Sequence, residues 1–198
     1  MRSLTPFLIM LVLAALVAGV TYAEAPQTAS QVIADWPDVP RNAANQMIEK
    51  YGQPDGITAS RLIWQNRGPW REIIVYREEI PHNFPKPHVD VLEQVINYRV
   101  PVHMYDDIAA YDGSVIVERT KGTMAARCDV EGANFLALNL AHDIVTGKRT
   151  VQDARQFYAE TIQQMMAGEE PEYTQRLLFE PHPPNVARDP DVVVIQEE

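Results

Sequence analysis

The sequence predicts a single α+β domain over residues 38–168, with a mostly antiparallel sheet of about five strands packed by four helices. Two observations predict this class. Segments with alternating apolar residues are joined in pairs by short turns, which is typical of antiparallel hairpins. Other segments repeat their apolar residues at the spacing of an amphipathic helix. The predicted order is helix, hairpin, strand, helix, hairpin and two helices, so we expect the helices to pack against the sheet.

The first predicted helix begins at Asp38, a residue suited to capping, and has Pro40 in its first turn, where a missing N–H is harmless. It ends at Gly52, because glycine is common just after a helix. The next segments, 62–65 and 70–77, alternate apolar and polar residues around an Asn-Arg-Gly-Pro turn. We expect them to form a hairpin.

The segment 91–100 is open to two interpretations. Apolar residues at period two favour a strand, whereas Leu92 and Ile96 also fit a helical turn. A short helix is expected over 102–111, and a second hairpin over 114–128.

The clearest helix follows Asp129 and ends at Gly147. It is apolar around most of its circumference, so we expect it to be buried. Thr150 and Asp153 have the spacing of a capping box and are expected to begin a last helix, which ends at Gly168.

The segments on either side of the domain lack a clear period. Residues 24–37 are expected to form a polar, irregular spacer, and residues 169–198 an extended acidic tail. Within the tail, residues 192–195 are four β-branched residues in a row. Such a run can add a strand to a sheet edge, either in this chain or in a partner.

The first 23 residues have the layout of a secretory signal peptide. Arg2 precedes an apolar run over 7–20, and Thr21 and Ala23 place small residues at positions −3 and −1 of a cleavage site. The run is shorter than the roughly 20 residues that cross a bilayer, although an uncleaved anchor stays open. We therefore expect an extracytoplasmic protein, periplasmic or secreted, which contacts a membrane only through a retained anchor.

The composition argues against two classes of partner. The chain has 198 residues and a formal net charge of −10 at pH 7. This negative net charge opposes binding to nucleic acid and to anionic lipid head groups, because both are themselves negatively charged. The negative charge is spread along the chain, so we interpret it as a contribution to solubility.

Tyr51, Gly52, Pro54, Asp55 and Trp64 place a Gly-x-Pro turn between the end of a helix and a hairpin. This arrangement resembles the small lipoproteins of outer-membrane assembly. The resemblance covers less than a fifth of the chain, and the lipidated cysteine of that family is absent here.

The segment 81–90 contains two histidines and a carboxylate, His82, His88 and Asp90. Such ligands suit a divalent transition metal ion. On a polyproline II path of about 3.1 Å per residue, the two histidines would lie roughly 19 Å apart. They could share an ion only if the loop doubled back, whereas His88 and Asp90 would face one side of a strand. We favour a stiff connector with no bound metal, whose histidines are exposed or hydrogen-bonded.

The same loop is a candidate for protein binding. Pro81, Phe84, Pro85 and Pro87 suggest a rigid, extended segment beside edge strands, and both features recruit other chains. The sequence has no serine-hydrolase elbow, zinc-protease motif or phosphate-binding loop. Our main hypothesis is therefore a non-catalytic envelope protein without a cofactor, whose protein partner is unknown. The alternative is a small periplasmic metal-binding protein.

Cys128 is the only cysteine, so it cannot form a disulfide within the chain. Its position before a helix would lower the pKa of its thiol. His142 lies about 18 Å further along that helix and cannot act as its base. A cysteine hydrolase would need His82, His88 or His103 instead. We favour a small buried residue at a strand end.

Three aromatic residues have structural and functional interpretations. Trp64 and Trp70 flank the first hairpin turn. They either stack on a sugar or peptide, or form a cross-strand aromatic pair, which we favour. His142 lies on an apolar helix face and is expected to be a hydrogen-bonded core residue, with Asn139 as a candidate partner.

Overall fold

A computed structural model describes residues 28–184 and 191–195, and these residues form one α+β domain. In this part of the chain, a six-stranded antiparallel sheet is accompanied by five α-helices. The strand order is β1-β2-β3-β4-β6-β5. The predicted fold class is confirmed.

Both predicted hairpins are present, and the ambiguous segment 91–100 contributes a strand, as its alternation favours. The third strand continues five residues beyond its predicted end at 77. The strands are β1 (Gly56–Ile57), β2 (Arg61–Arg67), β3 (Trp70–His82), β4 (His88–Asn97), β5 (Val115–Glu118) and β6 (Thr123–Cys128).

The helices begin and end close to the predicted signals. The capping box of the last helix is formed, because the Thr150 side chain accepts from the Asp153 N–H and the Asp153 carboxylate accepts from the Thr150 N–H. Asp38 does not cap its helix, since Pro37 occupies the N-cap position. The helices are α1 (Ala29–Ile33), α2 (Asp38–Tyr51), α3 (Tyr105–Tyr111), α4 (Glu131–Val145) and α5 (Val151–Met166), with short 3-10 turns η1 (Val102–Met104) and η2 (Glu172–Thr174).

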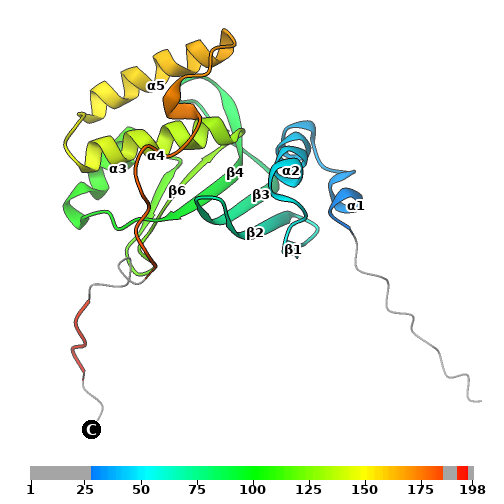
Figure 1. The fold of residues 1–198 in the computed structure, drawn as a ribbon, viewed down its shortest axis with the longest axis horizontal. Coiled ribbons are helices and arrows are strands. Elements are labelled where there is room, and N and C mark those ends of the chain that lie inside the picture. The colour runs from blue at the N-terminus through cyan, green and yellow to red at the C-terminus, as the bar shows by residue number, and fades with distance from the viewer. Residues whose placement is uncertain (1–27, 185–190, 196–198) are drawn as a thin grey trace, which may run out of the picture.

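The core lies between the sheet and its helices. α2 packs on β3 and β4, α4 packs on β4 and β6, and α5 packs against α3 and α4 (Figure 1). Leu136, Leu138 and Leu140 of α4 are fully buried, as the apolar circumference of this helix predicts. Asn134 of α4 donates to the Gln94 side chain of β4 at 3.0 Å, which ties the helix to the sheet.

The packed domain extends beyond the predicted bounds at both ends. Residues 24–37 were expected to be an irregular spacer, but α1 lies there and Trp36 is buried in the core. On the C-terminal side, Asn139 of α4 donates to the carbonyls of Tyr173 and Arg176, at 3.0 and 2.8 Å. These contacts hold the first part of the predicted tail against the domain, because its apolar side chains complete the core.

Two other predictions concern the chain ends. The signal segment, 1–23, lies outside the described residues. Residues 192–195 form no strand, and their side chains are between 74% and 94% exposed. None of the helices within the described ranges is long and apolar enough to cross a membrane.

Candidate metal centre

The loop 83–87 doubles back, so the extended polyproline II path between the two histidines is wrong. β3 continues to His82 and β4 begins at His88, and these two residues lie opposite each other in the sheet register. A register shift occurs between Val75 and Ile80. The imidazole centroids of His82 and His88 are 4.9 Å apart. Backbone pairing of the flanking strands has overridden the extended preference of the prolines.

One potential ligand atom from each of His82, His88 and Asp90 lies within 4.8 Å of the other two. His88 Nε2 is 3.2 Å from Asp90 Oδ1, and His82 Nδ1 is 3.5 Å from Asp90 Oδ2. Asp90 is 1% exposed, and its Oδ1 atom has no hydrogen bond of good geometry within the described residues, although His88 Nε2 lies 3.2 Å away. A protonated His88 pairs with this oxygen, and the same oxygen can serve as a ligand atom when a metal ion replaces the proton.

Neighbouring groups orient all three side chains. His88 Nδ1 lies 2.8 Å from the carbonyl oxygen of Lys86, so Nδ1 carries a proton and Nε2 is the nitrogen that faces Asp90. His82 Nε2 faces Asp112 Oδ1 at 3.6 Å, which leaves Nδ1 toward Asp90. Ser114 donates a hydrogen bond to Asp90 Oδ2. Metal-ligating histidines commonly have such outer partners, which fix their tautomer and ring orientation.

Cys128 lies at the edge of this cluster, with its Sγ atom 3.5 Å from His88 Nε2. A catalytic relay uses both imidazole nitrogens, one for the nucleophile and one for the carboxylate. Here His88 Nε2 faces both Cys128 and Asp90, so these three residues do not form such a relay. The Asp90 carboxylate and then the Cys128 contact raise the pKa of His88 to about 11. Burial raises the pKa of the Cys128 thiol, contrary to the lowering that we expected from the helix terminus. With a pKa of about 11, His88 holds a proton on Nε2 when no ion is bound, and a metal ion must displace that proton to use the nitrogen as a ligand. The geometry excludes a cysteine relay of this form.

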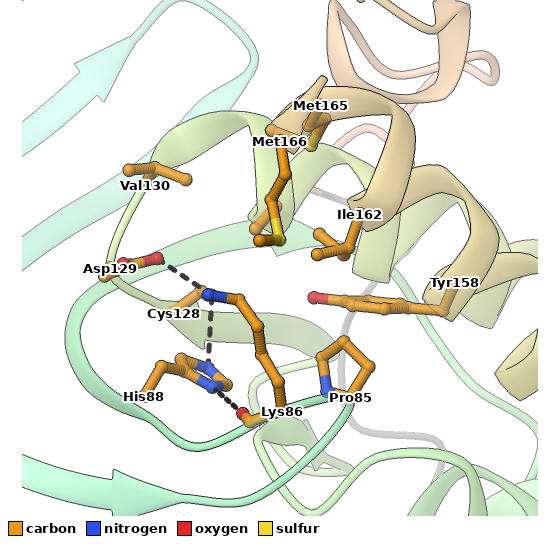
Figure 2. Close-up of a pocket in the computed structure, with 11 residues that line it drawn as sticks. Pro85, Lys86, His88, Cys128, Asp129, Val130, Tyr158, Ile162, Met165 and Met166 are labelled. Atoms are coloured by element: carbon orange, nitrogen blue, oxygen red, sulfur yellow. Dashed lines mark hydrogen bonds between the residues drawn. The ribbon is translucent and has the colours of Figure 1, made fainter. Parts of the chain in front are cut away.

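A cavity of about 200 Å³ adjoins the cluster (Figure 2). His88 and Cys128 lie on one side of it, and the Tyr158 hydroxyl points into it from α5. Ile162, Met165 and Met166 of the same helix supply much of its apolar wall. The sequence analysis did not predict this cavity, because its lining residues come from three segments that are far apart along the chain.

The partner-binding loop is only partly accessible. Pro81 and Pro87 are exposed, but Phe84 packs against Tyr158, with a centroid distance of 5.1 Å, and Pro85 lines the cavity. The loop therefore presents fewer apolar side chains to a partner than the sequence predicts.

The two tryptophans are not a cross-strand pair. Trp64 lies opposite Ile73, and Trp70 lies opposite Arg67. Both side chains are buried, and Trp70 stacks on Phe135 with a centroid distance of 4.8 Å. Neither indole is available for stacking on a sugar or peptide, so they are core residues.

His142 is hydrogen-bonded, as predicted, but to a different partner. Its Nδ1 atom is 2.7 Å from the hydroxyl oxygen of Tyr98, and its ring stacks on Phe179. Asn139 bonds instead to the C-terminal segment. Burial lowers the pKa of His142, which favours a neutral imidazole in the core.

The sequence analysis also missed a buried carboxylate, Glu131, at the start of α4. It accepts hydrogen bonds from Trp70 Nε1 at 2.8 Å and from Gln94 Nε2 at 2.9 Å, and it also contacts Lys50 and Tyr51. Burial by itself would raise the pKa of Glu131, but these donors outweigh it and lower the pKa. The sequence did show a charged residue at the start of an apolar helix. It could not show the hydrogen-bond partners of Glu131, which are 37 to 81 residues away along the chain.

Comparison of the chain with protein-family models, with curated proteins and with solved structures finds no match in any of the three. The resemblance to small outer-membrane lipoproteins thus has no further support. The functional argument rests on the geometry of the cluster.

Proposed function

We propose that this protein is exported and binds a divalent transition-metal ion through His82, His88 and Asp90. The observation that carries this proposal is the convergence of two imidazole nitrogens and one buried carboxylate within 4.8 Å. Additional support comes from the burial of Asp90 and from the groups that orient each histidine. The extracytoplasmic location is supported by the predicted signal segment alone.

The donor set favours zinc. Zinc binds nitrogen and oxygen at about 2.0–2.2 Å, and a tetrahedral arrangement then places neighbouring ligand atoms roughly 3.3 Å apart. The distance from Asp90 Oδ1 to His88 Nε2 is 3.2 Å, close to this value, whereas His82 Nδ1 faces the other Asp90 oxygen at 3.5 Å. The three ligand atoms lie within 4.8 Å of one another, so the side chains must close slightly around an ion. Three protein ligands leave one position of a tetrahedral ion open, which is typical of sites that bind a water or a small ligand. Iron, copper and nickel also bind histidine and carboxylate ligands.

We expect the untagged protein to bind one equivalent of zinc and His88→Ala to lose this binding by at least a hundredfold. The substitution removes one of three ligands, whereas loss of an outer partner typically weakens metal binding by about 10–100-fold. Calorimetric titration with zinc, together with metal analysis of the dialysed protein, measures this effect.

His103→Ala is the matched control, because His103 is exposed and lies outside the cluster. His82→Ala and Asp112→Asn extend the series, and we expect Asp112→Asn to weaken zinc binding by about 10–100-fold because it removes an outer carboxylate. Thermal melts establish that each variant is folded. Equal zinc binding by the wild type and by folded His88→Ala and His82→Ala would contradict the proposal.

We also propose, as a second function, that the protein binds a partner in the cell envelope. The exposed β-branched residues 192–195 favour this function, because such a segment can add a strand to another sheet. Pro81 and Pro87 are the exposed parts of the loop.

A photo-crosslinking residue at Val194, in intact cells, is expected to capture one reproducible protein that mass spectrometry identifies. The control is the same residue at Gln163, which is exposed on α5. Capture of the same set of proteins from both positions, or of none from Val194, argues against this second function.

A further inference from the structure

We infer that the cavity beside the metal centre binds a short-chain organic carboxylate, with its head group between the Tyr158 hydroxyl and the metal ion. This inference rests on the proposed function, because it uses the open position of that ion.

The cavity and the metal centre share a side chain. His88 Nε2 faces Asp90 Oδ1 at 3.2 Å and Cys128 Sγ at 3.5 Å, and both His88 and Cys128 line the cavity. An ion bound at Nε2 has His82 and Asp90 as its other protein ligands. Cys128 Sγ lies on the cavity side of this nitrogen, so a ligand in the cavity reaches the open position beside that sulfur.

The Tyr158 hydroxyl is a donor without an acceptor in the described part of the chain. Tyr158 is 2% exposed, and its ring is held by contacts with Phe84 and Tyr111. Figure 2 shows the hydroxyl directed into the cavity, and no hydrogen bond joins it to another described residue. Burial raises the pKa of Tyr158 well above its ordinary value, so the hydroxyl keeps its proton and donates. A carboxylate is a strong acceptor for such a donor.

Specific contacts at the cavity favour a carboxylate head group. Lys86 lines the cavity and supplies a positive charge. Asp129 also lines the cavity, and its Oδ1 atom accepts from the Cys128 thiol at 3.5 Å. Asp90 and Asp112 offset the two charges of a divalent ion. The open position of the ion and the Tyr158 donor therefore select the head group, and net charge does not.

The remaining wall and the volume define the body of the ligand. Val130, Ala133, Ile162, Met165 and Met166 give an apolar surface, and methionine adapts its shape to what it contacts. The volume of about 200 Å³ holds roughly seven non-hydrogen atoms at about 30 Å³ each. Pentanoate has this size, and hexanoate is larger by a single methylene group.

The test is calorimetric titration of the zinc-loaded protein with acetate, butanoate and hexanoate. We expect the affinity to rise by about fourfold for each methylene group, which corresponds to ~0.8 kcal/mol of apolar burial. Hexan-1-ol and hexylamine have the same chain without the carboxylate, and we expect both to bind at least tenfold more weakly than hexanoate.

Two variants separate the head group from the chain. Tyr158→Phe keeps the ring and removes the hydroxyl, so we expect at least a tenfold loss of hexanoate affinity, as for a hydrogen bond to a charged group. Ile162→Trp fills the cavity and is expected to abolish hexanoate binding. Tyr105→Phe and the exposed Gln163→Trp are matched controls that leave the affinity unchanged. All four variants are expected to retain one equivalent of zinc.

The outcomes distinguish this inference from the proposed function. If zinc binds but hexanoate binds no more tightly than acetate, or Ile162→Trp leaves its affinity unchanged, the cavity is not the site. Equal affinities for hexanol and hexanoate overturn the assignment of the head group. Equal hexanoate affinities with and without zinc overturn the contact with the ion. Absence of zinc binding contradicts the proposed function itself.

Discussion

Replacement of Glu131 by alanine is expected to lower the free energy of unfolding by about 3–5 kcal/mol. The side chain accepts hydrogen bonds from Trp70 and Gln94 and contacts Lys50 and Tyr51, which joins α2, β3, β4 and α4. Without the carboxylate, the buried Gln94 donor loses its strong acceptor and Trp70 keeps only the Tyr51 hydroxyl at 3.1 Å. A buried group left unpaired costs about 1–3 kcal/mol. Thermal or urea unfolding measures the loss.

Glu78→Ala is the control for this prediction, because Glu78 is exposed on β3 and is expected to change stability by less than about 0.5 kcal/mol. Similar stabilities for the two variants would show that Glu131 is not a structural carboxylate.

The pH dependence of stability gives a second measurement on the same residue. The pKa of Glu131 is lowered in the folded state, so its contribution is fully present above the ordinary value of 4.5 and is lost as the pH falls through the folded value. Glu131→Gln has no such titration. We therefore expect the difference in stability between wild type and Glu131→Gln to shrink below pH 4.5. A difference that grows toward low pH contradicts the assignment.

Zinc at a hundred times its dissociation constant is expected to raise the free energy of unfolding by about 2.7 kcal/mol. This corresponds to an increase in Tm of roughly 5–10 °C for a domain of this size. Asp90→Asn is expected to abolish the increase, because the amide keeps the shape of the side chain but lacks the charge that binds the ion. Thermal unfolding with and without zinc measures both effects.

Asp107→Asn is the matched control, since Asp107 is exposed on α3. It should be stabilised by zinc as much as the wild type. If Asp90→Asn is stabilised to the same extent, the ion binds somewhere else and the proposed centre is wrong.

Local signals in the sequence were sufficient for most of the fold. Thr150 and Asp153 predict the capping box at the start of α5, because both partners lie within one turn. Alternating residues around the turns at 66–69 and 121–122 predict both hairpins, since turn residues and side-chain period act over a few residues. The predicted burial of Cys128 also follows from strand parity.

The candidate metal centre was only partly predictable. His82, His88 and Asp90 were recognised as a possible ligand set, but polyproline geometry placed the two histidines far apart. That geometry holds only for a segment without backbone partners. In the structure, the strands on either side pair in register and leave five residues for the turn.

Among the outer residues of the centre, Cys128 was considered in the sequence together with His82, His88 and His103, whereas Asp112 and Ser114 gave no signal. Asp112 and Ser114 follow α3, and Cys128 ends β6, yet all three lie at the end of the β3–β4 hairpin. Ser114 is 24 residues from Asp90, and Cys128 is 40 residues from His88. Only the strand register shows that residues so far apart in the sequence are in contact.

The sequence by itself determined the α+β class, the positions of the hairpins and helices, and the predicted export signal, because each depends on interactions between residues close together in the chain. Only the tertiary structure decided that two histidines share one carboxylate, that Glu131 joins four elements, and that a cavity adjoins the centre. These features depend on strand register and helix packing, which bring together side chains that the sequence keeps far apart.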